Sequence, residues 1–232
     1  KARRIGVRMA DMRDPAIFDE VLRRRIKMAN AEMERMGLPA MDEEEMVKEV
    51  SAAADVLRPH ITNTIPVMHE AVASGKSILF EGAQGAYLDV DFGTYPFVTS
   101  SNTSSAGACT GTGVPPHKID RIIGVCKAYT TRVGSGPFPT ELEDVTGAHL
   151  RKVGHEFGAT TGRPRRCGWL DAFMLRYSAR LNSLDYLAIT RLDILDDLDT
   201  IKICTGYTYQ GKLLKEYPGR VYRCADHQIV DV

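Results

Sequence analysis

The sequence has no excess charge of either sign and no long apolar run. Its 232 residues contain 30 Lys and Arg against 30 Asp and Glu, so the formal net charge is zero. A chain without net charge has no long-range field that would draw it to nucleic acid or to an anionic membrane. No stretch approaches the roughly 18 consecutive apolar residues of a membrane-spanning helix. We therefore expect no nucleic acid and no membrane among its partners, and a cytoplasmic location.

The sequence also lacks paired cysteines. Its 5 cysteines are an odd number, and no two of them are close in the sequence, which suits neither a disulfide framework nor a zinc site. The 44% of hydrophobic residues is sufficient for a folded core and excludes disorder as the main state. Because the first residue is Lys1 rather than Met, we expect the chain to be a piece of a longer protein.

The first 75 residues have a helical pattern. Apolar residues recur at spacings of three and four between residues 15 and 36, after an Asp14-Pro15 pair that suits a helix N-terminus. Two shorter helices are expected at residues 42–57 and 63–73. We predict a helical subregion over residues 1–75, followed by one incomplete α/β domain over residues 76–232.

The second region alternates short apolar runs with one helical pattern. Strands are predicted at 78–80, 121–128, 184–190 and 200–207, a helix at 170–181, and a hairpin at Gln210-Gly211. Uninterrupted apolar runs are typical of parallel strands that are buried on both faces. The fold class is therefore α/β, with a mostly parallel central sheet flanked by helices and a helical region at the start of the chain.

A long segment rich in Gly, Ser and Thr follows the first predicted strand, over residues 82–113. Loops of this length inside a compact domain are usually functional, although a disordered linker is the alternative. Gln84 lies between two glycines where ligands of α/β sheets bind, and its amide can contact the edge of a heterocycle. The alternative for Gln84 is an ordinary tight turn.

Two further loops carry groups that suit a nucleotide. Residues 94–103 present several hydroxyls and an amide that can bind phosphate oxygens, although Ser and Thr are also common in loops. In residues 131–141, glycines and prolines define a particular backbone path after a predicted strand. A surface turn is the alternative for that segment.

The segment 157–171 gathers two threonines and three arginines in a glycine-flanked loop. Three guanidinium groups within four residues repel one another unless anions compensate them. Because each guanidinium matches the geometry of carboxylate and phosphate, a small dianionic ligand could organise this loop. The alternatives are a solvated basic patch and a contact to RNA.

A cation and a carboxylate follow the strand predicted at 184–190. They are Arg191 and Asp193, two residues apart. An aspartate at a strand end can accept hydrogen bonds from N1–H and the exocyclic amine of guanine, while the cation covers the ring face. A strand-end salt bridge is the alternative.

Taken in this order, the motifs resemble those of the adenylosuccinate synthetase family. The matching phrases are residues 80–85, 94–102, 132–141, 160–171 and 190–196. The resemblance implies a core like that of the P-loop NTPases and the GTP-dependent ligation of IMP and L-aspartate to adenylosuccinate, GDP and phosphate, on the route to AMP. It also implies Mg²⁺ as cofactor and a homodimer, with IMP, L-aspartate and GTP as substrates.

The resemblance assigns roles to ten residues. The IMP contacts would be Arg3 (reaching into the partner's site, with Arg4 as the alternative by a slip of one residue), Gln84, Thr99, Val133 and Arg163. The aspartate contacts would be Thr160, Thr161 and Arg163. The GTP contacts would be Arg165, Arg191 and Asp193.

The sequence departs from the family pattern in four ways. Arg191 stands where the family commonly has Lys, and Pro164 where some members have Arg. The Gly-Asp-Glu-Gly-Lys-Gly-Lys loop, with its catalytic aspartate and magnesium ligands, and the catalytic histidine that follows are absent from these 232 residues. The C-terminal segment that completes the guanine pocket is also absent, so we expect no catalytic residue and no activity in this chain alone. Two other interpretations are a guanine-nucleotide-binding regulator and a truncated noncatalytic paralogue.

Overall fold

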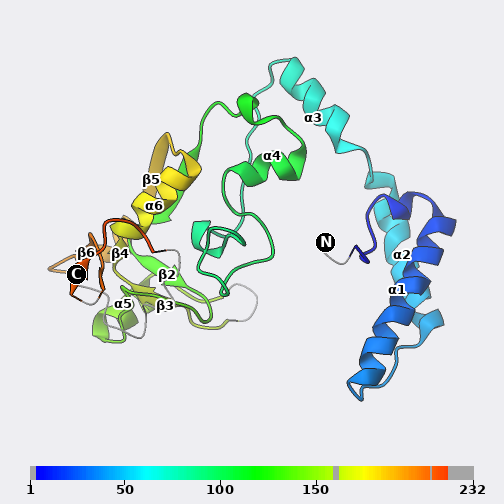
Figure 1. Cartoon of the computed structure of the whole chain (residues 1–232), viewed down its shortest axis with the longest axis horizontal. Helices are drawn as coiled ribbons and strands as arrows, with labels where there is room; N and C mark the ends of the chain where they lie inside the picture. Colours follow the sequence, from blue (N-terminus) through cyan, green and yellow to red (C-terminus); the bar gives the residue numbers. More distant parts are fainter. Residues whose placement is uncertain (1–3, 159–161, 210, 219–232) are drawn as a thin grey trace. The chain divides into compact units, whose positions relative to one another are not determined.

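The computed structural model describes residues 4–158, 162–209 and 211–218 (Figure 1). The chain separates into two compact units, Lys1–Thr64 and Ile65–Val232, and each is described by itself. Helix α3, Thr64–Ala73, therefore belongs to the second unit apart from its first residue. None of the described helices is long and apolar enough to span a membrane.

The first unit is helical, as its apolar spacing predicts. It contains η1 (Asp11–Arg13), α1 (Pro15–Arg35), α2 (Glu43–Leu57) and η2 (Arg58–His60). The carboxylate of Asp14 caps α1 by accepting from the backbone N–H of Ala16 at 2.9 Å, and that of Asp42 caps α2. The buried residues of the two helices form one core, made of Phe18, Leu22, Ile26, Val47 and Ala54.

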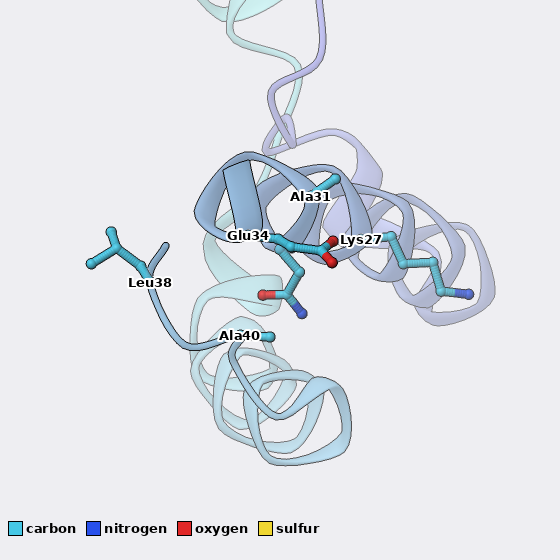
Figure 2. A pocket seen from close by; sticks show the side chains of 6 residues that line it. Lys27, Ala31, Glu34, Leu38 and Ala40 are labelled. Atoms are coloured by element: carbon cyan, nitrogen blue, oxygen red, sulfur yellow. The ribbon is translucent and has the colours of Figure 1, made fainter. Parts of the chain in front are cut away.

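Polar contacts fix the angle between α1 and α2. The Arg23 guanidinium bonds Glu44 at 2.6 Å and Asp19 at 3.0 Å, so it joins the middle of α1 to the start of α2. The Asn30 side chain exchanges two hydrogen bonds with the backbone of Met41. Figure 2 shows an open groove beside the end of α1, and none of its lining residues is a predicted site residue. It is lined by Lys27, Asn30, Ala31, Glu34, Leu38 and Ala40.

The second unit alternates strands and helices. Its helical elements after α3 are η3 (Ala86–Leu88), α4 (Ala106–Thr112), η4 (Pro116–Lys118), α5 (Val145–Val153), α6 (Ala172–Asn182) and η5 (Leu192–Leu195). Its strands are β1 (Ile123–Lys127), β2 (Thr130–Arg132), β3 (Arg166–Gly168), β4 (Leu170–Asp171), β5 (Tyr186–Thr190), β6 (Ile203–Cys204), β7 (Thr208–Tyr209) and β8 (Lys212–Leu213).

The α/β class is confirmed, and its strands form pairs. β1 pairs with β5 and β4 pairs with β6 in parallel, whereas β2–β3 and β7–β8 are antiparallel. The register aligns Lys127 with Thr190, so the carboxyl ends of β1 and β5 lie side by side. The predicted hairpin is confirmed by β7–β8; Gln210 itself lies outside the described residues.

One predicted strand does not form. Residues 78–80 have no ladder partner in the described part of the chain and belong to no strand. A strand requires a neighbour for its hydrogen bonds, and an apolar run by itself does not supply one. The run predicted at 200–207 forms only the two-residue strand β6.

The core of the second unit lies beside the ends of β1 and β5. One cluster joins the residues after β1 to α5, β3 and η5, and Figure 1 shows α5 next to β3. It consists of Ala128, Tyr129, Leu150, Cys167, Ile194 and Leu195. A second cluster joins α6 to β6 and contains Phe173, Met174, Cys204 and Tyr207.

Candidate functional site

Asp89 organises the glycine-rich loop that follows η3. Its side chain is fully buried, and Oδ1 accepts from the backbone N–H groups of Asp91 at 2.9 Å and Phe92 at 3.1 Å. Oδ2 accepts from those of Thr103 at 2.7 Å and Ser104 at 3.1 Å. Burial opposes ionisation, but the four backbone donors outweigh it and lower the pKa of Asp89. The segment is therefore a loop with a defined structure and not a disordered linker.

The loop around Asp89 carries two of the predicted IMP residues. The backbone N–H of Thr99 donates to the Leu88 carbonyl at 2.8 Å, which sets the position of its hydroxyl. The Thr103 hydroxyl donates to the Gly85 carbonyl at 2.7 Å and fixes the turn that precedes η3. Gln84 is exposed at that turn, with a left-handed φ of 62°. Its amide is therefore presented at the surface of the loop.

Arg132 joins this loop to the segment that follows β2. Its Nη2 donates to the Thr94 hydroxyl at 2.9 Å and to the Phe97 carbonyl at 3.2 Å, while Nε donates to the Ser135 carbonyl at 3.1 Å. Burial, with a smaller contribution from nearby Arg166, lowers the pKa of Arg132. The structure thus brings together two predicted motifs, and Val133 lies exposed next to the linking arginine.

A buried carboxylate lies at the carboxyl end of β1. Glu156 is 1% exposed, and its Oε1 accepts from the Lys127 ammonium and from the Tyr129 hydroxyl, both at 2.6 Å. Its Oε2 accepts from Nη1 of Arg165 at 2.8 Å. Burial alone would raise the pKa of Glu156, but these charged and hydroxyl donors lower it. Glu156 therefore stays ionised and compensates two cations.

Arg166 is also compensated from within the protein. Its guanidinium bonds the Glu141 carboxylate, donates to the Gly136 carbonyl at 2.8 Å and lies 5.4 Å from the centre of the Phe138 ring. Arg165 and Arg166 are thus each paired with a carboxylate of this chain, and the expectation that a dianionic ligand organises the loop stays a prediction. Two internal carboxylates neutralise their repulsion, which sequence reasoning missed because Glu141 lies 25 residues away from its partner.

The remaining arginine of the loop is placed, but the two threonines are not. Arg163 is exposed, and its carbonyl accepts from the backbone N–H of Gly158 at 2.8 Å. Thr160 and Thr161 lie outside the described residues, as does Arg3. Their roles toward aspartate and IMP stay predictions.

Arg191 and Asp193 follow directly after β5. Arg191 adopts a left-handed φ of 62° and Asp193 is exposed on η5, whose next two residues, Ile194 and Leu195, are buried in the core. The ion pairs of this unit join Glu156, Glu141 and Glu216 to their cations, and none of them links Arg191 to Asp193 in the described part of the chain. The carboxylate of Asp193 is therefore presented outward on an anchored turn.

The cluster around Glu156, at the carboxyl end of β1, carries a net positive charge. Lys127 and Arg165 share the single carboxylate of Glu156, and burial raises the pKa of the neighbouring Tyr129 hydroxyl. The Nε of Arg165 is buried without a hydrogen-bond partner among the described residues. Such an arrangement favours an anion, because it leaves both charge and a donor uncompensated. No group of three or more His, Cys, Asp or Glu side chains in the described ranges is arranged to hold a metal ion.

We expect acid to destabilise the protein through Asp89 and Glu156. Because their folded-state pKa values are lowered, their stabilisation is complete above unfolded-state pKa values of about 4 and is lost as the pH falls through the lowered values. Asp171 acts in the opposite direction, because burial raises its pKa. Urea unfolding at neutral pH and at about pH 3 should show a lower midpoint in acid, and Glu156→Gln should reduce that difference. An equal difference in the wild type and the variant would contradict the assignment to Glu156.

Comparisons with known proteins agree with this arrangement. Residues 1–230 match the family model described as adenylosuccinate synthetase. The chain is 54% identical over 222 residues to the adenylosuccinate synthetase of Geobacter metallireducens, covering 95% of this chain and 52% of that protein. It is 57% identical over 183 residues to that of Desulforudis audaxviator, covering 79% and 43% of the two chains.

A solved structure supports the same assignment. A fully ligated adenylosuccinate synthetase from Plasmodium falciparum matches 99% of this chain with a TM-score of 0.91 and 38% identity, and the match covers 54% of that chain. The chain thus spans about half the length of the relatives that it matches. Because the family model covers nearly all of its residues, the chain belongs to the adenylosuccinate synthetase family.

Proposed function

We propose that this chain carries the substrate-contacting loops of a GTP-dependent ligase that converts IMP and L-aspartate to adenylosuccinate, GDP and phosphate. The observation that best supports the proposal is that Lys127 and Arg165 share the single carboxylate of Glu156 and so keep a net positive charge, in the unit that also exposes the carboxylate of Asp193. A nucleoside triphosphate needs both features, because its phosphates are anionic and guanine presents hydrogen-bond donors to a carboxylate. In this assignment Asp193 and Arg191 contact guanine, and Arg165 faces the phosphates.

The proposed chemistry explains why several loops converge on one nucleotide. The 6-oxygen of IMP is a poor leaving group until GTP phosphorylates it, after which the amino group of aspartate displaces the phosphate. In this reaction the chain would position the substrates and neutralise the charge of their phosphates and carboxylates. Gln84 would hold the hypoxanthine 6-position, Thr99 the IMP phosphate and Val133 the nucleotide through its backbone. Thr160, Thr161 and Arg163 would bind the aspartate carboxylates, with Arg163 also near the IMP ribose.

The residues that the structure describes do not suit the magnesium ion that the family implies, because no acidic cluster is arranged around a common point among them. The family's magnesium ligands and catalytic base belong to a phosphate-binding loop that these 232 residues do not contain. General acid–base catalysis likewise has no agent here, so activity would require sequence other than this chain.

The two faces of the β1–β5 pair support that requirement. Both strands expose large apolar side chains, namely Ile123, Val125, Tyr186, Leu187 and Ile189. Parallel strands of this composition are normally covered on both faces by other layers. A homodimer, in which Arg3 reaches the partner's IMP site, and a cytoplasmic location complete the proposal.

An activity assay tests the proposed function. The full-length product of the gene that carries this sequence is mixed with IMP, L-aspartate, GTP and Mg²⁺, and adenylosuccinate is measured by ultraviolet absorbance. We expect product with GTP and at least about 100-fold less with ATP, because a site built around the donors of guanine rejects a purine that lacks them. The purified 232-residue chain should give no product. Product from this chain alone, or equal rates with ATP, would contradict the proposal.

A guanine-nucleotide-binding regulator is less favoured than the ligase. Such a protein would need only the turn that carries Asp193. This chain also contains the loop that is held by hydrogen bonds to Asp89, and Arg132 connects that loop to the segment with Val133. A regulator that binds guanine alone has no use for these contacts.

A further inference from the structure

We propose that Glu156 is a positioning residue that holds the Arg165 guanidinium in place for the triphosphate. The inference rests on the proposed function, because it takes Arg165 as the arginine that faces the GTP phosphates. Nothing in the sequence motifs singles out Glu156, which lies just before the arginine-rich loop.

Arg165 is tied to Glu156 through its backbone and through its side chain. Its backbone N–H donates to the Glu156 carbonyl at 2.9 Å, and its Nη1 donates to Oε2 of the same residue at 2.8 Å. The Arg165 carbonyl accepts from Nε of Arg151 on α5 at 2.9 Å. An arginine side chain normally loses rotamer freedom when it binds a ligand. Here the Arg165 side chain is already ordered in the folded protein, so binding of the ligand costs less conformational entropy.

The Glu156 carboxylate does not neutralise the positive charge that would attract an anion, because it is shared with Lys127. A carboxylate bonded to Arg165 alone would form a neutral pair with little attraction for phosphate. Because Oε1 also binds the Lys127 ammonium at 2.6 Å, the group of three charges retains a net positive charge. The Tyr129 hydroxyl fixes the same oxygen at 2.6 Å. Glu156 therefore orients Arg165 without neutralising the site.

The neighbouring pair of Glu141 and Arg166 provides a matched control. It is also a Glu–Arg pair whose arginine belongs to this loop, with Glu141 21% and Arg166 31% exposed, against 1% for Glu156 and 30% for Arg165. Its arginine, however, is occupied by the carbonyls of Gly134 and Gly136 as well as by Glu141. Arg166 therefore holds backbone in place and has no assigned contact with the triphosphate.

The test measures steady-state kinetics of the full-length gene product. Glu156→Gln removes the charge from a bond to Arg165, so we expect the KM for GTP to rise about tenfold while the KM values for IMP and aspartate change less than about twofold. Glu141→Gln should leave the KM for GTP within about twofold. Glu156→Asp, which keeps the charge but retracts the carboxylate by one methylene, should raise the KM for GTP and serves if the glutamine variant does not fold.

A double-mutant cycle separates positioning from general destabilisation. If Glu156 acts through Arg165, Glu156→Gln should raise the KM for GTP less than about twofold further in an Arg165→Lys background. An equal rise in the KM of all three substrates, or additive effects in the cycle, would overturn the inference. A rise with Arg165→Lys but none with either Glu156 variant would also overturn it and leave the proposed function standing. Loss of the proposed function is recognised separately, because the wild type then makes no adenylosuccinate or Arg165→Lys leaves the KM for GTP unchanged.

Discussion

Replacing Asp89 by alanine should lower the free energy of unfolding by about 3–5 kcal/mol and weaken IMP binding by at least about 100-fold. The buried carboxylate accepts from four backbone N–H groups, which alanine would leave without an acceptor. Each buried donor left unpaired costs about 1–3 kcal/mol, and water reaching the opened loop recovers part of this cost. The loop carries Thr99 and follows Gln84, so its collapse would displace both proposed IMP contacts.

Urea unfolding and IMP titration of the full-length protein measure both effects. Asp91→Ala is the matched control, because Asp91 belongs to the same loop but is exposed, and its carboxylate accepts from the Asn102 side chain at 2.8 Å. We expect that variant to lose less than about 1 kcal/mol. Equal losses in the two variants would show that Asp89 does not organise the loop.

Replacing Asp193 by asparagine should reduce kcat/KM for GTP by about 10³-fold and improve the use of XTP. Guanine presents two donors, N1–H and the exocyclic amine, and a carboxylate accepts from both. An asparagine amide sets its own NH₂ against one of these donors, whereas xanthine has a carbonyl at that position. Sites built around particular hydrogen bonds discriminate by about 10⁴-fold, which is the upper bound of the expected change.

The ratio of kcat/KM for GTP to that for XTP is the measured quantity. Asp196→Asn is the control, because Asp196 is an exposed aspartate at the other end of the same turn. It should leave the ratio unchanged. If Asp193→Asn lowers the activity with GTP and XTP equally, Asp193 does not contact the base, and its position on η5 would have another purpose.

Local patterns in the sequence predicted the elements of the fold. Helices α1 and α2 follow from apolar spacing and from the capping residues Asp14 and Asp42, which act within one turn of the chain. Strands β1 and β5 follow from short apolar runs between turn residues. The prediction at residues 78–80 was wrong for the described chain because a strand also needs a partner, which a local pattern does not contain.

The candidate motifs and their order along the chain can be predicted from the sequence, since they depend on residue types at short spacing. Which charges meet depends on the tertiary fold. Glu156 reaches Lys127 across 29 residues, Glu141 reaches Arg166 across 25, and Arg132 reaches Thr94 across 38. Such pairs depend on the path of the whole chain, and burial then sets their electrostatic strength. The three arginines that look alike in the sequence therefore differ in the fold: Arg166 holds backbone, Arg165 is held for a ligand, and Arg163 remains exposed.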